Sequence, residues 1–172
     1  RYLKSGELLT EEDIQRLGRN QAIYFGAIGD PRIPPGVLEK GILIAMRTAF
    51  DQYVNLRPSK SWHPYTPLKK ERDFDITFLR ENTEDFYMGA GGSLRGRKGK
   101  ATVSIKRKLY DLRVDLTSAS SRDEEFAFEI GMMSRSGIER FADFAMSMAR
   151  TKGKDSITVV DKANVCTQLY GL

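Results

Sequence analysis

The stretch that decides the fold runs from residue 47 to residue 87. Its arginines lie within three segments, GILIAMRTAF (41–50), YVNLRP (53–58) and FDITFLRENTEDFY (74–87). Each segment is largely apolar and carries one arginine: Arg47, Arg57 or Arg80. A guanidinium is always charged, matches a carboxylate with its fork of donors, and is costly to bury without an anion. Three such arginines predict a small anionic ligand with more than one carboxylate or phosphate group.

Residues 36–50 (GVLEKGILIAMRTAF) are predicted to form a helix. Leu43, Ile44 and Arg47 recur at α-helical spacing, and Lys40 lies one turn earlier on the same stripe. The other side is apolar too, so the helix is expected to be buried with Arg47 pointing inward. The alternative is that Arg47 extends its charged end to the surface.

Two further helices are predicted at 11–18 and 135–151, the first capped by Thr10 with Asp13 and the second by Ser134 or Ser136. Five segments are predicted as strands: 22–28, 74–80, 101–118 as one or two strands, 126–133 and 156–160. Arg80 and Lys162 then lie at the carboxyl ends of strands, where open α/β sheets bind ligands. The alternative for Lys162 is an ordinary surface lysine.

The composition excludes several classes of protein. No apolar run approaches the ~18 residues of a membrane span. The single cysteine, Cys166, excludes an internal disulfide and a cysteine-ligated metal site, and it fits a reducing, cytoplasmic compartment. The single histidine, His63, excludes a histidine-rich metal centre, and its place in the polar loop WHPY argues against a Ser-His-Asp triad.

The net charge of +5 has a local origin. Residues 95–113 hold eight basic side chains and one acidic one, a net +7, so the rest of the chain is about −2. Only Tyr110 could stack on a base within this segment. A solvated basic hairpin arm is therefore favoured over a surface for nucleic acid.

Four motifs in this chain together resemble one enzyme family: AIYFGAIGDPRIP (22–34), LIAMRTAFDQYVNLRP (43–58), DITFLRENTEDFY (75–87) and ITVVDKANV (157–165). The chain is similar to the isocitrate/isopropylmalate dehydrogenases, the metal-dependent, nicotinamide-linked decarboxylating dehydrogenases of (2R)-hydroxy acids, which include isopropylmalate, isocitrate, homoisocitrate, tartrate and D-malate enzymes. The resemblance implies an α/β fold with a mixed sheet, helices on its faces and a protruding β arm.

The resemblance also implies residue roles. Arg47, Arg57 and Arg80 match the arginines that bind malate-type carboxylates. Tyr87 matches the tyrosine that protonates the enol after decarboxylation. Lys162 matches a lysine that helps to remove the hydroxyl proton, similar to one that acts in the neighbouring subunit's site of a homodimer. Asn164 matches a residue near the nicotinamide carboxamide. The implied cofactors are NAD or NADP with Mg²⁺ or Mn²⁺.

The chain departs from the family pattern in lacking its glycine-rich N-terminal strand-loop, its metal-binding aspartates and its adenosine-binding loop. It resembles the middle of a chain about twice as long. Residues 1–52 are expected to belong to the cofactor-side domain, and 53–172 to the smaller domain for substrate and dimerisation, with a basic arm at about 89–118. No metal ligand is assigned within this chain, which alone is not expected to be catalytically competent.

The substrate is inferred from the residues before Arg47. Gly41 and Leu43 stand where isocitrate enzymes place a serine and an asparagine, and Leu43 with Ile44 resembles the apolar pocket of isopropylmalate enzymes. Lys40 replaces the glutamate typical of those. A 3-substituted D-malate, with 3-isopropylmalate first, is favoured. D-malate or tartrate comes next, then isocitrate or homoisocitrate. The alternative class is a non-catalytic regulatory subunit of such an enzyme.

Overall fold

The computed structural model describes residues 1–62, 64–65, 68 and 73–172, so the argument about His63 lies outside the described residues. The chain divides into two compact units. The first unit combines Arg1–Gln52 with Thr83–Met132, and the second combines Tyr53–Asn82 with Met133–Leu172. Each unit thus joins two separate stretches of sequence.

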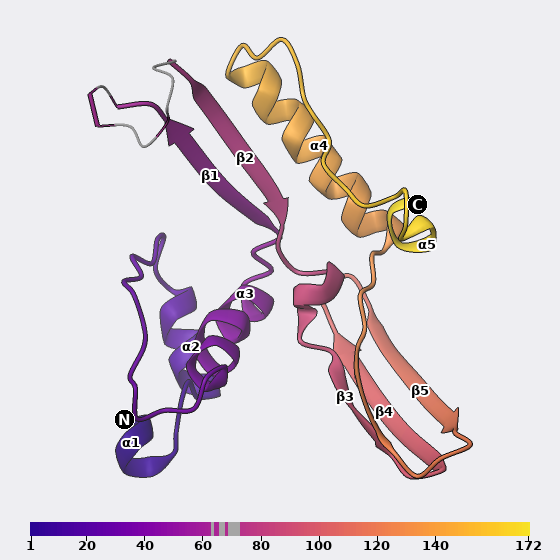
Figure 1. The fold of residues 1–172 in the computed structure, drawn as a ribbon. Coiled ribbons are helices and arrows are strands. Elements are labelled where there is room, and N and C mark those ends of the chain that lie inside the picture. Colours follow the sequence, from indigo (N-terminus) through magenta and orange to yellow (C-terminus); the bar gives the residue numbers. More distant parts are fainter. Residues whose placement is uncertain (63, 66–67, 69–72) are drawn as a thin grey trace. The chain divides into compact units, whose positions relative to one another are not determined.

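The N-terminal part of the first unit is helical (Figure 1). It contains α1 (Tyr2–Ser5), α2 (Glu11–Gly18), the π-helix η1 (Glu39–Ile44) and α3 (Ala45–Ala49). The predicted capping box of α2 is confirmed, because the Asp13 N–H donates to Thr10 Oγ1 over 3.2 Å and the Thr10 N–H donates to Asp13 Oδ2 over 3.0 Å. This exchange satisfies two amide groups that a helix start otherwise leaves unpaired.

The helix predicted at 36–50 is present over 39–49, but its first six residues form a π-helix instead of an α-helix. A π-helix closes its hydrogen bonds over five residues instead of four and is therefore wider. The α-helical spacing that put Lys40 on one stripe with Arg47 does not carry across this wider turn. Met46 is buried, while Leu43, Ile44 and Arg47 are half-buried and Lys40 is exposed.

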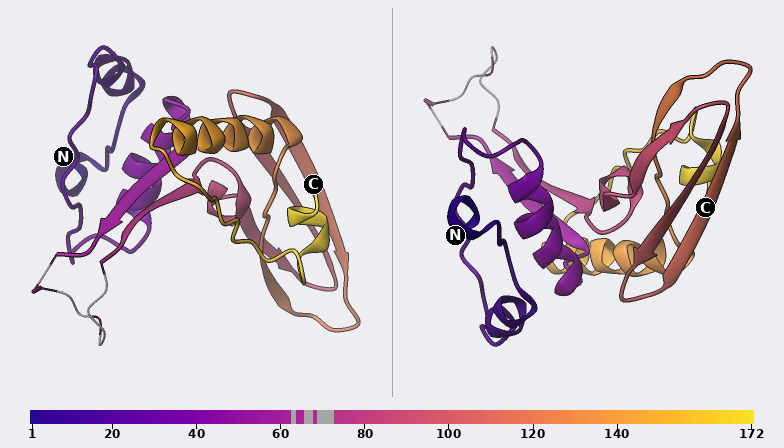
Figure 2. Two further views of the ribbon diagram at one scale, coloured as in Figure 1. Left: turned by 90° about the horizontal axis from the view of Figure 1, so that it is seen from above. Right: turned by 90° about the horizontal axis from the view of Figure 1, so that it is seen from below.

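The remainder of the first unit consists of the 3₁₀ turn η2 (Asp85–Met88) and four strands, β3 (Gly91–Arg95), β4 (Lys98–Lys106), β5 (Asp111–Ala119) and β6 (Glu125–Glu129). Strand β4 pairs with β5 and β3 with β6, both antiparallel, and Figure 2 shows these ribbons from two further directions. The segment predicted as one or two strands is thus two. The strand predicted at 126–133 ends at residue 129.

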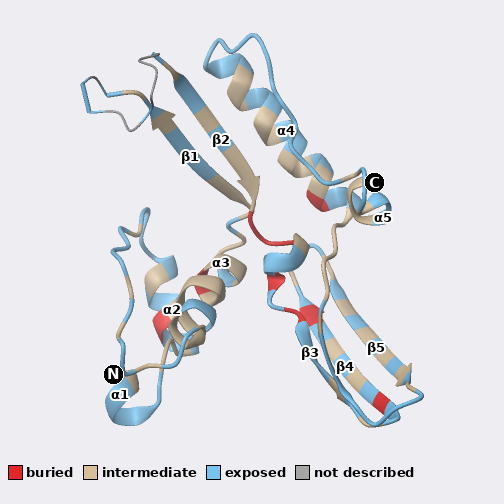
Figure 3. Ribbon diagram, in the orientation of Figure 1, coloured by how far each residue is buried: buried red, intermediate tan, exposed pale blue. Residues whose placement is uncertain are grey.

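A small core holds these ribbons together (Figure 3). Met88, Ala90 and Ile105 are buried, and five half-buried apolar side chains pack against them: Val103, Tyr110, Leu112, Ile130 and Met132. Along β4 and β5 exposed and covered residues alternate, which is the period-2 pattern of a sheet with one face in water.

The second unit contains β1 (Val54–Lys60), β2 (Asp75–Glu81), α4 (Arg135–Thr151) and α5 (Thr167–Tyr170). Strands β1 and β2 form an antiparallel pair. Helix α4 has the predicted bounds, and its Gly137 N–H donates to the predicted cap Ser134 over 3.0 Å. Tyr53 joins the two parts of this unit: the Arg140 guanidinium lies 4.3 Å from its ring centroid, and Phe144 packs edge-on at 6.3 Å.

The strands predicted at 22–28 and 156–160 are wrong for this structure. Both segments are irregular, and Val160 keeps 90% of its surface exposed. Their β-branched and aromatic residues favour strands, but a strand exists only where another strand pairs its backbone groups. Within the described residues, the six strands pair only with one another, so none of them pairs with residues 22–28 or 156–160. Lys162 therefore does not follow a strand.

The predicted α/β class is confirmed, since helices accompany three two-stranded antiparallel sheets in the part of the chain that the structure describes. Over that same part, no helix is both long and apolar enough to cross a membrane.

The capping box of α2 generates a prediction about pH. Hydrogen bonds from the Thr10 backbone and from the Arg1 guanidinium lower the pKa of Asp13 to about 2. Because the pKa of the folded state is depressed, the carboxylate stabilises α2 above pH ~4 and loses this effect as the pH falls toward 2. We expect Asp13→Asn to weaken amide hydrogen-exchange protection in α2 at pH 6, and the deficit to shrink between pH 4 and 2.5.

The control is Glu11→Gln, which removes a carboxylate from an exposed position in the same helical turn. A deficit in protection that stays constant from pH 6 to 2.5 in Asp13→Asn would contradict the role given to this carboxylate.

Candidate functional site

The β1–β2 hairpin brings two of the predicted arginines together. Arg57 lies on β1 and Arg80 on β2, and Asn55 is the direct cross-strand partner of Arg80. Arg57 Nε donates to Asn55 Oδ1 over 2.8 Å, and Arg80 Nη2 donates to Asn82 Oδ1 over 3.2 Å. Asn55 Nδ2 donates to the same Asn82 oxygen over 3.3 Å. The two guanidinium groups are therefore connected through two asparagine amides.

Sequence reasoning missed Asn55 and Asn82. The signal was available, because each asparagine stands two positions from its arginine, in NLR and in REN, and side chains two apart lie on the same face of a strand. An amide oxygen accepts a hydrogen bond without carrying a charge. It can fix the direction of a guanidinium and leave its positive charge available to an anion.

The exposure of the two arginines differs. Arg57 is exposed, and among the described residues it forms no ion pair with a carboxylate. Arg80 is half-buried near the end of β2, and the next two residues after Glu81, Asn82 and Thr83, are buried. The hairpin thus presents one guanidinium to water and holds the other closer to the protein.

The helical segment of the first unit holds four other predicted residues. Arg47 lies on α3, and Lys40, Leu43 and Ile44 lie on η1 directly before it. Leu43 and Ile44 are half-buried, so they can offer apolar surface next to a guanidinium. This arrangement fits a ligand that has both an anionic group and an apolar substituent.

Tyr87 also belongs to the first unit, where it lies on the turn η2. Its side chain keeps 63% of its surface exposed, while Glu84, three residues earlier, keeps only 1%. The phenol group is thus presented at the surface of a turn that follows the buried Glu84 and ends at the buried Met88.

Lys162 and Asn164 lie in the second unit, in the turn that precedes α5. The Asp161 carboxylate accepts from the Ala163 N–H over 2.9 Å, and the Lys162 carbonyl accepts from the Cys166 N–H over 2.9 Å. Both side chains are exposed. The DKAN motif is therefore a hydrogen-bonded turn that presents an ammonium and an amide to solvent.

The predicted residues therefore fall into two groups. The first unit contains Lys40, Leu43, Ile44, Arg47 and Tyr87, and the second contains Arg57, Arg80, Lys162 and Asn164. Of these residues, Arg57 and Arg80 are brought together by the hydrogen bonds described above.

The chemistry of a metal site is not provided by the described residues. They contain no group of three or more His, Cys, Asp or Glu side chains that could hold a metal ion. In the loop after residue 28, the Asp30 carboxylate is already paired with Arg32, which donates from Nε to Asp30 Oδ1 over 2.8 Å. Hydrogen bonds from the Arg32 side chain and backbone lower the pKa of Asp30 to about 2. The residues present therefore do not fit a divalent metal by themselves.

Three of the eight basic side chains in segment 95–113 form ion pairs within their own unit. Arg95 contacts Glu125 at 2.8 Å, Arg113 contacts Asp115 at 3.1 Å, and Lys108 lies 3.9 Å from Asp51. Hydrogen bonds from the Thr102 and Arg113 side chains also lower the pKa of Asp115. These pairs support the interpretation of this segment as a structural arm.

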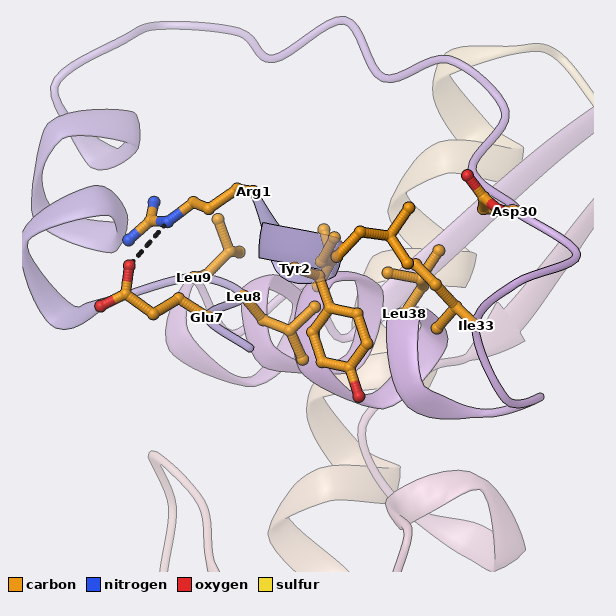
Figure 4. A pocket seen from close by; sticks show the side chains of 10 residues that line it. Arg1, Tyr2, Glu7, Leu8, Leu9, Asp30, Ile33 and Leu38 are labelled. Atoms are coloured by element: carbon orange, nitrogen blue, oxygen red, sulfur yellow. Dashed lines mark hydrogen bonds and ion pairs between the residues drawn. The ribbon is translucent and has the colours of Figure 1, made fainter. Parts of the chain in front are cut away.

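A pocket of about 380 Å³ lies among the N-terminal helices and loops of the first unit (Figure 4). Leu8, Ile33, Leu38 and six other residues line it together with Ile42 of η1. None of the predicted site residues lines this pocket. Leu8 packs so closely over Gly41 that a Cβ at position 41 would overlap its side chain. A side chain at position 41 would therefore have to displace the side chain of Leu8.

Comparison with known proteins gives a consistent result. The family model described as isocitrate/isopropylmalate dehydrogenase matches residues 1–171. A 3-isopropylmalate dehydrogenase of Bifidobacterium longum is 38% identical over 96% of this chain and 41% of its own length. Those of Corynebacterium diphtheriae and Corynebacterium glutamicum are 38% and 39% identical over 100% of this chain and 44% of their own lengths. The chain spans less than half the length of these relatives.

The contact of Leu8 with Gly41 predicts that the effect of Gly41→Ala on the free energy of unfolding depends on whether Leu8 is present. A helical Gly→Ala change usually stabilises by about 1 kcal/mol, whereas overpacking usually costs about 1–3 kcal/mol. We expect Gly41→Ala to lower the free energy of unfolding of the whole protein in urea. In a Leu8→Ala background the same change should be neutral or stabilising.

The control is Gly29→Ala, since no atom lies within 4 Å of a Cβ at that position. An equal loss from Gly41→Ala with Leu8 present and with Leu8 truncated would show that this packing does not restrict position 41.

Proposed function

The chain belongs to the isocitrate/isopropylmalate dehydrogenase family, and on that premise we propose that the whole protein oxidatively decarboxylates a 3-substituted D-malate, with 3-isopropylmalate as the favoured substrate. The observation that carries the proposal is the pair of arginines on the β1–β2 hairpin, which are joined through Asn55 and Asn82. Two oriented cations on a rigid strand pair suit a ligand with two carboxylates.

Substrate binding is assigned to three arginines. Arg47, Arg57 and Arg80 are each assigned to bind carboxylate oxygens of the substrate, as the family resemblance implies. Leu43 and Ile44 contact the apolar substituent on the third carbon, and Lys40 lies at the edge of that contact. Binding through fixed guanidinium groups holds the reacting carbon in place, which is a large part of catalysis by proximity.

The acid–base steps are assigned to Lys162 and Tyr87. Lys162 removes the proton of the substrate hydroxyl while the hydrogen on the same carbon leaves as a hydride, and a ketone forms. The bond to the carboxylate β to that ketone then breaks, carbon dioxide leaves, and the electron pair forms an enolate. Tyr87 donates its phenolic proton to the third carbon of the enolate, which gives the 2-keto acid product.

Asn164 is assigned to contact the carboxamide of NAD or NADP, which would supply the hydride acceptor when bound. Mg²⁺ or Mn²⁺ is expected for this family, but the described residues do not fit a metal, so no step is assigned to one. We further propose a cytoplasmic homodimer in which Lys162 serves the neighbouring subunit's site.

The choice among substrates depends on the surroundings of Gly41 and Leu43. The close packing of Leu8 over Gly41 supports an apolar site, because a serine at position 41 would have to displace the Leu8 side chain. An apolar pocket discriminates one methylene group by only about 1–3 kcal/mol, so D-malate and tartrate remain the second candidates. Isocitrate and homoisocitrate come third.

The test is a steady-state assay of the whole protein with Mn²⁺ or Mg²⁺. It follows reduced nicotinamide with 3-isopropylmalate, D-malate, tartrate and isocitrate, each with NAD and with NADP. We expect kcat/KM to be highest for 3-isopropylmalate. No turnover with any of the four acids, in a folded protein, would contradict the proposal and favour a regulatory subunit.

The amide that holds Arg57 generates a more specific prediction. Asn55→Ala removes the hydrogen bond, while Asn55→Asp keeps an acceptor but adds a negative charge that competes with the substrate for Arg57. We expect Asn55→Asp to raise KM for 3-isopropylmalate by about tenfold, which corresponds to about 1.4 kcal/mol, and to raise it more than Asn55→Ala. Steady-state kinetics decides this, and an Asp variant that binds as well as the wild type would rule out the role of the neutral amide.

A further inference from the structure

One arginine of the basic arm holds the turn that carries Tyr87. Arg107 follows the end of β4, and its side chain donates from Nε to the Thr83 carbonyl over 2.8 Å and from Nη2 to the Met88 carbonyl over 3.1 Å. Its third bond, from Nη1 to the Lys106 carbonyl over 2.9 Å, fixes the guanidinium to its own strand. The fork thus connects β4 to residues on both sides of Tyr87.

The other side of the same turn is fixed by residues 131–132. The Asp85 N–H donates to the Met132 carbonyl over 2.8 Å. The Phe86 ring contacts Gly131, where a Cβ would come within 2.8 Å of it. Asp85 has a positive φ of 63°, which is a strained conformation for a residue with a side chain and needs support from its surroundings.

From these contacts we propose that Arg107 is a positioning residue for Tyr87. It does not touch the substrate; it fixes the backbone at both ends of the turn, so that the phenol of Tyr87 projects in one direction. The inference rests on the proposed function, in which Tyr87 donates a proton to the enolate.

An arginine is required for this task by its geometry. Its planar group offers donors in a fixed fork, so one side chain can bond two carbonyls with a defined separation. A lysine ammonium is a single point and cannot span the Thr83 and Met88 carbonyls in the same manner. The proposal also gives a role to Arg107 itself, which is one of the eight basic residues of the arm and has no carboxylate partner among the described residues.

The effect on catalysis follows from the distance requirement of proton transfer. A general acid must come within about 2.6–3.2 Å of the atom that it protonates, and a displacement of about 1 Å can cost about 100-fold in rate. Substrate binding by the arginines needs no contact with Tyr87. Loss of Arg107 should therefore lower kcat and leave KM for the hydroxy acid nearly unchanged.

The first experiment measures kcat and KM of the whole protein with Arg107→Met. We expect kcat to fall at least about tenfold with less than a threefold change in KM, and Arg107→Lys to recover only part of the loss. The matched control is Arg113→Met, which removes a cation from β5 that contacts Asp115 instead of the turn. A normal kcat in Arg107→Met, or an equal loss in Arg113→Met, would overturn the proposal.

A double-mutant cycle separates positioning from a general loss of stability. If Arg107 acts through Tyr87, adding Arg107→Met to Tyr87→Phe should lower kcat no further, because the phenolic proton donor is already absent. The full tenfold effect in the Tyr87→Phe background would show that Arg107 acts elsewhere. Gly131→Ala displaces Phe86 from the opposite side and should show the same lack of additivity with Tyr87→Phe.

A second readout needs no activity. With 3-fluorotyrosine at position 87, the whole protein should give one narrow ¹⁹F resonance, and Arg107→Met should shift or broaden it while Arg113→Met leaves it unchanged. An unchanged resonance in Arg107→Met would overturn the positioning role. If the protein turns over none of the acids, the proposed function fails, but this spectrum still decides whether Arg107 positions Tyr87.

Discussion

The proposed binding of a dicarboxylate depends on one constraint: an arginine that must receive an anion cannot be held in place by another anion. A carboxylate partner would orient the guanidinium but would also compete with the ligand for it. Arg57 on the hairpin meets this constraint with an amide. It donates to the side-chain oxygen of Asn55, which is a strong acceptor without charge. The amide thus orients the Arg57 guanidinium without neutralising its positive charge.

The other arginines of the chain show the contrast. Arg95 and Arg113 contact the carboxylates of Glu125 and Asp115, and such exposed pairs usually contribute little, about 0–1 kcal/mol. Among the residues that the structure describes, Arg107 bonds only backbone carbonyls. The arginines that pair with carboxylates therefore differ in role from the arginine that bonds to backbone carbonyls and fixes another segment. A count of basic residues does not reveal this difference.

The sequence was a good guide wherever structure is determined locally. The bounds of α4 and the caps at Thr10 and Ser134 were predictable, because a cap and a helical stripe are encoded within a few residues. The segments 22–28 and 156–160 were not, because β-branched residues describe a preference whereas pairing needs a second strand from elsewhere in the chain. The π-helix at 39–44 was missed for a related reason, since the apolar spacing alone fits the narrower helix as well.

The candidate site was predictable to the same extent. The arginines and Tyr87 could be found from their motifs, but the groups that hold them could not be assigned without the strand register and the arm. Asn55 and Asn82 carry a weak local signal, whereas Arg107 lies 20 residues beyond Tyr87 and carries none. There is a physical reason why the sequence carries no local signal for Arg107. Because Arg107 bonds to backbone carbonyls, it places no demand on the side chains of the turn. Those side chains can then be selected for chemistry, while the position of the turn is fixed from the strand beside it.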